Sequence, residues 1–285
     1  MLEGIIVKNI SNLYTVLCGE ERYDCIPRGV LRHESITPLV GDHCKIDLQN
    51  KIILEILPRK NELSRPKVAN VDVALIVTSL KHPDFSSFLL DKEIASVMLA
   101  HVTPVICFTK LDLLEDTKAY QEMRTYYESI GIPCFDNQHI DELLLYLKDQ
   151  VVVLTGQTGA GKSSLLNKID PKLSLATQEI SEALNRGVHT TRHSEIYEVC
   201  HVKFLDTPGF SSLELQGREP REVAQAFQEF GNYTCKFDDC MHDKEIACGV
   251  KEAVKQGTIL LSRYENYLKI LEEVKHENRC FVSKK

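Results

Sequence analysis

The chain has 285 residues, a formal net charge of −7 and 26% charged residues, which is the balance of an ordinary globular protein. This charge excludes a uniformly basic polymer binder of the histone type, although it leaves room for a local nucleic-acid patch. No stretch approaches the ~18 consecutive apolar residues of a membrane span, and the first residues do not resemble a secretory leader. We therefore expect a cytoplasmic protein without membrane association, long enough for two or three compact units.

Residues 1 to about 65 contain five short β-rich runs separated by turn-prone residues. The runs are residues 4–10, 13–18, 22–27, 43–48 and 51–57. Five strands in so short a segment predict a small barrel, with an OB-fold as the first candidate and an SH3-like barrel as the alternative.

Basic side chains flank the later strands of this predicted barrel and are placed where they could contact RNA phosphates. They are Arg28, Arg32, His33, Arg59, Lys60, Arg65 and Lys67. The competing interpretation is an ordinary solvated barrel surface.

Residues 65–150 alternate between strand and helix patterns, which predicts an α/β unit. Residues 71–78 and 104–109 are continuous apolar runs, as in parallel strands covered on both faces. Residues 132–135 are a third strand candidate, and residues 91–100, 117–130 and 141–148 have helical spacing.

The second of these strands runs into Thr109, Lys110 and Asp112. A carboxylate just past a strand end can accept two hydrogen bonds from guanine, while the lysine packs over the base plane. Adenine lacks that pair of donors, so Asp112 would discriminate against it. Taken alone, the motif is also compatible with a surface Lys-Asp pair.

Residues 156–163 read Gly-Gln-Thr-Gly-Ala-Gly-Lys-Ser and follow the apolar run 151–154. Strand, glycine loop and helix start together predict a phosphate-binding loop rather than a simple glycine-rich turn. Its backbone N–H groups and the helix N-terminus would hold phosphate oxygens. The predicted nucleotide-binding residues here are Gly156, Gln157, Thr158, Gly159, Ala160, Gly161, Lys162, Ser163 and Ser164.

Two side chains of this loop have predicted chemical roles. Lys162 would reach the β- and γ-phosphates and stabilise the charge that develops in hydrolysis, and the Ser163 hydroxyl would hold Mg²⁺.

Residues 195–200 and 202–205 predict a β-hairpin whose second strand runs into Asp206-Thr-Pro-Gly209. Asp206 is predicted to join the Mg²⁺ shell, and the Gly209 N–H to sense the γ-phosphate. A threonine upstream would close the metal site, Thr191 in preference to Thr190.

Phe210 stands where many GTPases have a glutamine that orients the attacking water. A phenylalanine cannot do so, which predicts slow intrinsic hydrolysis and a need for another group. His189 is the candidate catalytic residue, with an ordinary solvent-exposed loop histidine as the alternative.

Cys235, Cys240, His242 and Cys248 have the spacing C-x4-C-x-H-x5-C. Three thiolates and one imidazole match a closed tetrahedral Zn²⁺ site, which leaves no position for a catalytic water and so predicts a structural metal. The other seven cysteines are expected to be reduced and mostly in the core. Residues 259–274 predict a helix with one buried face.

The order of the nucleotide motifs is unusual, because residues 109–112 precede the phosphate loop and residues 206–209 follow it. This order is that of a circularly permuted GTPase. With a barrel before it and a zinc motif after it, the chain resembles the small-ribosomal-subunit biogenesis GTPase family RsgA, also called YjeQ. Residues 59–66 and 69–72 resemble that family's junction. Thr109, where asparagine is commonest, and residues 136–139, in place of a Ser-Ala loop, depart from the usual GTPase pattern.

The resemblance implies an OB-fold RNA-binding domain (1–65), a circularly permuted P-loop GTPase domain (66–215) and a zinc-binding helical domain (216–285). It also implies a GTP hydrolase that uses Mg²⁺, is stimulated by the small ribosomal subunit and binds rRNA late in 30S maturation. We expect a monomer. The alternatives are a GTP-gated RNA-binding adaptor whose hydrolysis is incidental, and a permuted GTPase of another ribonucleoprotein.

Overall fold

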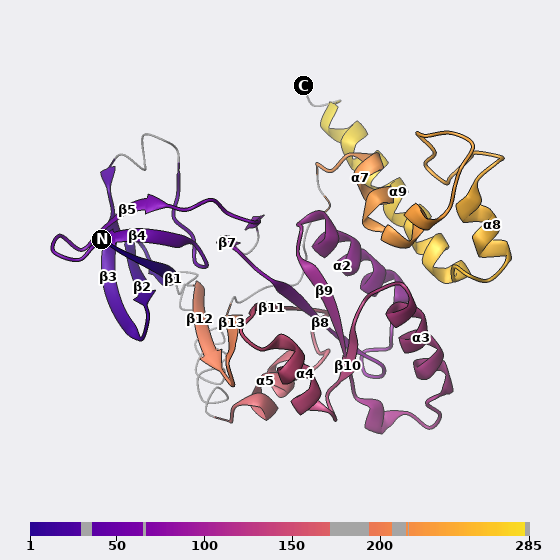
Figure 1. Cartoon of the computed structure of the whole chain (residues 1–285). Coiled ribbons are helices and arrows are strands. Elements are labelled where there is room, and N and C mark those ends of the chain that lie inside the picture. Colours follow the sequence, from indigo (N-terminus) through magenta and orange to yellow (C-terminus); the bar gives the residue numbers. More distant parts are fainter. Residues whose placement is uncertain (30–35, 65–66, 172–193, 207–214, 216, 283–285) are drawn as a thin grey trace.

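The computed structural model describes residues 1–29, 36–64, 67–171, 194–206, 215 and 217–282 (Figure 1). For residues 64, 194, 206 and 278–282 it describes the backbone alone. The barrel and the C-terminal helices lie on different sides of the central α/β unit (Figure 1). In the described part of the chain, no helix is long and apolar enough to cross a membrane.

The N-terminal strands close into the predicted five-stranded barrel. They are β1 (Leu2–Ile10), β2 (Leu13–Cys18), β3 (Glu21–Pro27), β4 (His43–Asp47) and β5 (Ile52–Ile56). The barrel closes because β1 pairs with both β2 and β4, while β3 pairs in parallel with β5. Alternate residues such as Tyr14, Val16 and Ile46 point inward and form its core. This arrangement confirms the barrel prediction and agrees with the OB-fold.

The central unit is a mostly parallel sheet with the strand order β10-β9-β8-β11-β13-β12. Its strands are β8 (Val73–Ser79), β9 (Thr103–Thr109), β10 (Cys134–Asp136), β11 (Val151–Thr155), β12 (Ser194–Val199) and β13 (Val202–Asp206). Within this unit β12 alone is antiparallel, paired with β13 in the predicted hairpin.

Two helices cover each face of this sheet, because its strands are apolar on both sides. The helices are α2 (Ser87–Leu99), α3 (Lys118–Ser129), α4 (Ile140–Leu147) and α5 (Lys162–Ile169). Ala74 and Ile76 of β8 share a core with α2 and α3. Leu75 and Val77, which alternate with them, share a core with α4 and α5. The carboxyl ends of the parallel strands therefore meet at one edge of the sheet.

The barrel and the central sheet are joined by hydrogen bonds, which the sequence did not predict. Barrel strand β1 pairs antiparallel with β12, placing Lys8 opposite Glu195 and Asn9 opposite Ser194. The Lys8 ammonium lies 2.6 Å from the Glu195 carboxylate. The result is one eleven-stranded sheet that runs from β10 to β4. A separate two-stranded sheet, β6 (Glu62–Ser64) and β7 (Lys67–Ala69), follows the barrel.

The C-terminal unit contains α7 (Pro220–Ala226), the 3-10 helix η2 (Gln228–Asn232), α8 (Gly249–Lys255) and α9 (Leu261–Val282). The predicted long helix is present and extends further than its apolar pattern indicated. The core of the C-terminal unit includes Phe227, Tyr267 and Leu271. The same core contains Ala95 and Leu99 from α2 of the central unit. The C-terminal unit is therefore packed directly on α2.

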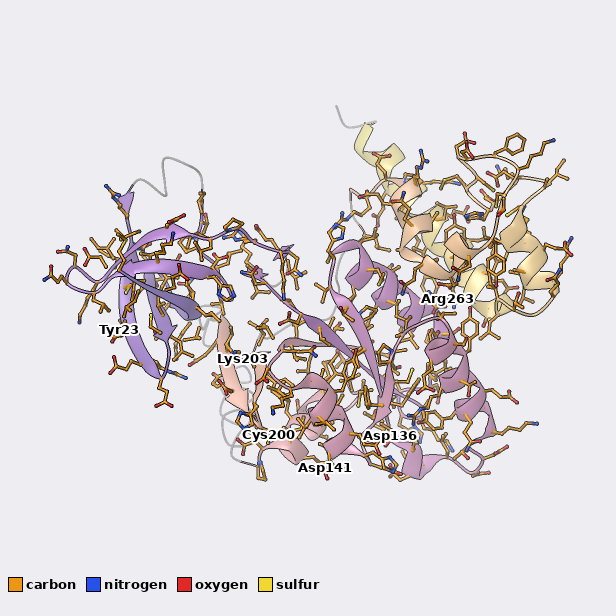
Figure 2. All side chains as sticks on the ribbon, in the orientation of Figure 1. Tyr23, Asp136, Asp141, Cys200, Lys203 and Arg263 are labelled. Atoms are coloured by element: carbon orange, nitrogen blue, oxygen red, sulfur yellow. The ribbon has the colours of Figure 1, made fainter. Side chains whose placement is uncertain are left out.

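A buried ion cluster fixes this contact, with Arg263 of α9 at its centre (Figure 2). Arg263 donates to Asp91 of α2 at 2.7 Å and to Glu229 at 2.7 Å, and its guanidinium lies 4.3 Å from the Phe227 ring centroid. Burial raises the pKa of Asp91, and Arg263 is the main group that opposes the rise. Both buried carboxylates thus share one cation, the Arg263 guanidinium.

Replacing Arg263 with methionine is expected to lower the free energy of unfolding by about 3–5 kcal/mol, because two buried carboxylates lose their partner. Urea denaturation followed by circular dichroism measures the loss. Arg221→Met, on the exposed side of α7, is the control and should change stability by less than about 0.5 kcal/mol. A loss for Arg263→Met no larger than the control's would contradict this interpretation.

Candidate nucleotide site and metal centre

The phosphate loop lies where the sequence predicted it, between β11 and α5. Gly156, Gly159 and Gly161 all have positive φ values, of 131°, 80° and 100°. A Cβ atom on Gly156 would lie 2.1 Å from the carbonyl oxygen of Val77, so no other residue fits there. The loop's tight course therefore depends on glycine for both conformation and space.

Lys162 begins α5 and folds back over this loop. Its Nζ donates to the carbonyl oxygens of Gly156 and Gln157, the latter at 3.0 Å. Burial lowers the pKa of Lys162, and the carboxylate of Glu93 partly offsets this effect. The ammonium is thus held at the mouth of the loop, next to the backbone that would surround a phosphate.

Thr109 and Lys110, at the end of β9, are bonded to the phosphate loop. The Thr109 hydroxyl donates to the carbonyl of Ala160 at 2.6 Å, and Lys110 Nζ donates to the carbonyl of Gly159 at 2.9 Å. Lys110 adopts a left-handed backbone conformation with φ of 61°. Asp112 follows, exposed, in the 3-10 helix η1 (Leu111–Leu113). Thr109 therefore ties the predicted base-reading segment to the predicted phosphate site.

The loop after β10 is closed by Asp136, which lies at the end of that strand (Figure 2). Asp136 Oδ1 accepts from the N–H groups of Gln138 at 2.9 Å and His139 at 3.1 Å, while the N–H of Asn137 donates to Phe108. Burial would raise the pKa of Asp136, but the His139 side chain and these N–H groups lower it overall. The backbone N–H groups of residues 137–139 are thus all bonded within the protein.

The register of β13 brings the end of that strand to the same edge. Val153 of β11 lies opposite Leu205, so the Asp206 backbone is level with Leu154, two residues before the phosphate loop. Ser163 is exposed in the first turn of α5. His189, Thr191, Gly209 and the side chain of Asp206, all predicted site residues, lie outside the described part, as does Phe210.

Comparisons with known proteins agree with this geometry. Residues 56–216 match the model of the RsgA GTPase, and residues 3–52 match that of the RsgA N-terminal domain. The chain belongs to the RsgA GTPase family. It is 43% identical to the small ribosomal subunit biogenesis GTPase RsgA 2 of Oceanobacillus iheyensis, over 96% of this chain and 98% of that protein. It is 44% identical to the small ribosomal subunit biogenesis GTPase RsgA of Enterococcus faecalis, over 100% of this chain and 98% of that protein.

Two solved structures are similar over almost their whole length. The crystal structure of YjeQ from Thermotoga maritima gives a TM-score of 0.82 at 35% identity, covering 96% of this chain and 98% of that one. YloQ, described as a circularly permuted GTPase, gives 0.80 at 35% identity, covering 97% and 96%. These likenesses confirm the permuted GTPase fold and the GTPase activity predicted from the motif order.

The Cys/His cluster of this RsgA-family chain has the geometry of a metal centre. The ligand atoms of Cys235, Cys240, His242 and Cys248 all lie within 4.8 Å of one another. His242 Nδ1 lies 3.5 Å from the sulfurs of Cys235 and Cys240 and 3.4 Å from that of Cys248. The sulfurs of Cys235 and Cys248 are 3.8 Å apart. A tetrahedron with Zn–S of about 2.3 Å and Zn–N of about 2.05 Å has edges of about 3.8 and 3.5 Å. The four residues therefore fit Zn²⁺.

The surroundings of the cluster hold its ligands in place and in metal-binding form. Tyr264 and Tyr267 of α9 donate to the carbonyls of His242 and Met241 at 2.6 and 2.5 Å. The Glu245 carboxylate accepts from the N–H of Met241 at 2.9 Å. Burial lowers the pKa of His242, which favours the neutral imidazole that binds metals. Sequence spacing identified the ligands but not these supporting residues.

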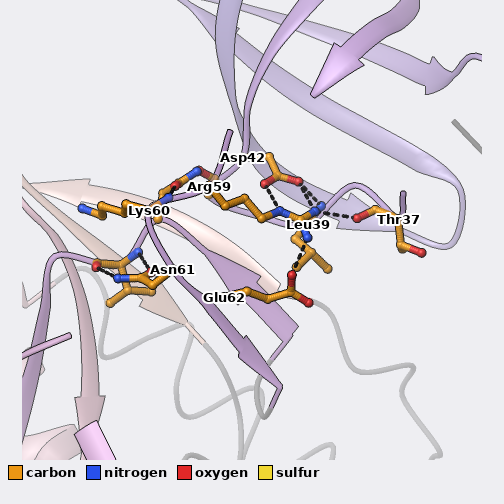
Figure 3. A network of polar contacts seen from close by, with 10 residues as sticks. Thr37, Leu39, Asp42, Arg59, Lys60, Asn61 and Glu62 are labelled. Carbon is orange, nitrogen blue, oxygen red and sulfur yellow. Dashed lines mark hydrogen bonds and ion pairs between the residues drawn. The ribbon is translucent and has the colours of Figure 1, made fainter. Parts of the chain in front are cut away.

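Two of the basic residues predicted for RNA binding form ion pairs with carboxylates of the protein, as Figure 3 shows for Arg59. Arg59 donates to the fully buried Asp42 at 2.7 Å, to Glu62 at 2.5 Å and to the carbonyl of Thr37 at 2.7 Å. Lys60 pairs with Asp72 at the end of the barrel segment. Arg59 and Lys60 thus both have partners at the junction between barrel and central unit, and their contact with RNA phosphates stays a prediction.

Proposed function

We propose that this GTPase acts on the small ribosomal subunit during its maturation, as the names of its relatives state for them. GTP or GDP would occupy the phosphate loop, and the subunit would be the partner that stimulates hydrolysis. The observation that carries the proposal is the bonding of Thr109 and Lys110 to the carbonyls of the phosphate loop. It holds the guanine-reading segment and the phosphate-binding segment in one fixed relation.

The residues predicted for the site have distinct roles in the proposed reaction. Asp112 accepts from the guanine edge and selects it against adenine. The loop amides and Lys162 bind the phosphates and stabilise the charge on the leaving β-phosphate. Ser163 and Asp206 would hold Mg²⁺, which would supply positive charge against the nucleotide phosphates.

The proposal keeps three further assignments of the sequence as expectations. His189 is the group that compensates for Phe210, Thr191 completes the Mg²⁺ site, and the Gly209 N–H senses the γ-phosphate. The chain divides into an RNA-binding barrel (1–65), the GTPase (66–215) and a zinc-stapled domain (216–285). It works as a monomer that binds rRNA.

The proposal is tested by measuring GTP turnover in three samples. They contain the protein alone, the protein with purified small subunits, and the protein with purified large subunits. We expect slow turnover alone, strong stimulation by small subunits and none by large ones, because Phe210 leaves the free enzyme without a water-orienting glutamine. ATP in place of GTP is the control for base selection and should not be hydrolysed. Equal turnover in the three GTP samples would contradict the proposal and favour the GTP-gated adaptor.

A further inference from the structure

Glu93 is an acidic residue in the apolar stripe of α2. It lies three residues after Leu90 and next to Ile94, both of which are buried against the sheet. Its neighbours Asp91 and Lys92 face the C-terminal unit instead, bonding to Arg263 and Glu273. Of these three charged residues, Glu93 is thus the one on the sheet side of the helix, where α2 packs beside β8.

The Glu93 carboxylate is buried and incompletely bonded. Its Oε2 atom has no hydrogen-bond partner among the described residues. Two groups stabilise its charged form, the Lys162 ammonium and Thr155, the last residue of β11. Both belong to the segment that forms the phosphate loop. Burial raises the pKa of Glu93 to about 7, which Lys162 and Thr155 only partly oppose.

We propose that Glu93 is a positioning residue that acts through Lys162 and weakens the hold of the phosphate loop on its nucleotide. The inference rests on the proposed nucleotide site. The Glu93 carboxylate and the bound phosphates interact with the same Lys162 ammonium. Each therefore reduces the electrostatic stabilisation that the other receives from Lys162. A buried carboxylate is also poorly screened, so its repulsion of a phosphate is stronger than that of a surface charge.

The repulsion can be relieved by protonation of Glu93, which makes nucleotide binding depend on pH. Phosphate charges raise the pKa of Glu93 above its value in the free protein, so nucleotide binding takes up a proton. Affinity is therefore highest where Glu93 is already protonated and falls as pH rises through about 7. Among the described residues, Lys162 is the charged group acting on it from the loop, while Asp91 and Lys92 are paired elsewhere.

The experiment compares wild type, Glu93→Gln and Glu122→Gln in titrations with fluorescent GDP and Mg²⁺. Glu122 is an exposed glutamate of α3 and serves as the matched control. At about pH 8.5 we expect Glu93→Gln to bind GDP about tenfold tighter than wild type, and at about pH 6 equally well. Glu122→Gln should bind GDP as tightly as wild type at both pH values. The titration of GDP itself affects all three proteins equally and so cancels in the comparison. Glu93→Gln that binds like wild type, or more weakly, at the higher pH would overturn the inference.

Thermal unfolding without nucleotide separates this inference from the proposed function. A carboxyl with its folded pKa raised above the unfolded value destabilises the folded protein once pH exceeds the unfolded pKa. Glu93→Gln should therefore melt higher than wild type at about pH 8.5, with the gain shrinking toward about pH 5. If Glu93→Gln melted no higher than wild type at the higher pH, the argument that Glu93 carries a buried charge would be overturned. A wild-type protein that binds no GDP would instead refute the proposed function, and the melting result would still stand.

Discussion

Replacing Lys162 with alanine is expected to lower GTP turnover about a thousandfold or more, the largest effect of any single change in the nucleotide site. Its ammonium is held at the mouth of the loop by the carbonyls of Gly156 and Gln157. No other described cation donates to those carbonyls. Without it, the charge that develops between the β- and γ-phosphates loses its nearest fixed positive partner.

Single-turnover hydrolysis with excess enzyme measures this loss in the presence of small subunits, where we expect wild-type turnover to be fastest. Lys118→Ala, at the exposed start of α3, is the matched control and should leave the rate within about twofold. Circular dichroism should show that both variants are folded, since neither side chain fills the core. A Lys162→Ala protein that retained more than about a tenth of the wild-type rate would contradict the assigned role.

Replacing Cys240 with serine is expected to unfold the C-terminal unit and lower the thermal midpoint by about 10 °C or more. Structural zinc contributes about 10–16 kcal/mol of binding free energy in small zinc domains, and loss of one thiolate removes much of it. The segment between η2 and α8 has little core of its own apart from Cys248 and its neighbours. We therefore expect its fold to depend on a bound metal more than on apolar burial.

Zinc content per chain and differential scanning calorimetry together measure this effect. Wild type should retain one zinc ion and the Cys240→Ser protein much less. Cys200→Ser is the control, because Cys200 is an exposed cysteine at the tip of the β12–β13 hairpin, away from the cluster. If Cys240→Ser kept a full equivalent of zinc and an unchanged midpoint, the four-ligand assignment would be wrong.

Local patterns predicted the elements and the motif positions well, because they depend on residues close together in the chain. The phosphate loop, the barrel strands and the zinc spacing are all of this kind. Pairing over long separations was not predictable in the same way. The Arg59–Asp42 pair, 17 positions apart, was not predicted from the sequence. The Arg263–Asp91 pair, 172 positions apart, gave no sequence signal.

Glu93 is a residue for which a signal existed and was missed. The spacing of Leu90, Ile94 and Val97 defines the buried stripe of α2, and Glu93 falls within it. A charged residue at such a position is unusual unless it is paired, so it marks either a site or an ion pair. Only the fold shows that the charge of Lys162, in the phosphate loop, influences the pKa of this carboxyl.

The shared sheet of barrel and GTPase changes how the chain can be divided. Within the described sheet, β12 is covered on one side by β13 and on the other by β1. A shortened chain that began near residue 66 would expose the N–H and C=O groups of β12 as an open edge. Such edges recruit strands from other molecules and promote aggregation. The barrel therefore acts as the edge cover of the GTPase sheet, and the boundary near residue 65 divides the sequence without dividing the hydrogen-bonded structure.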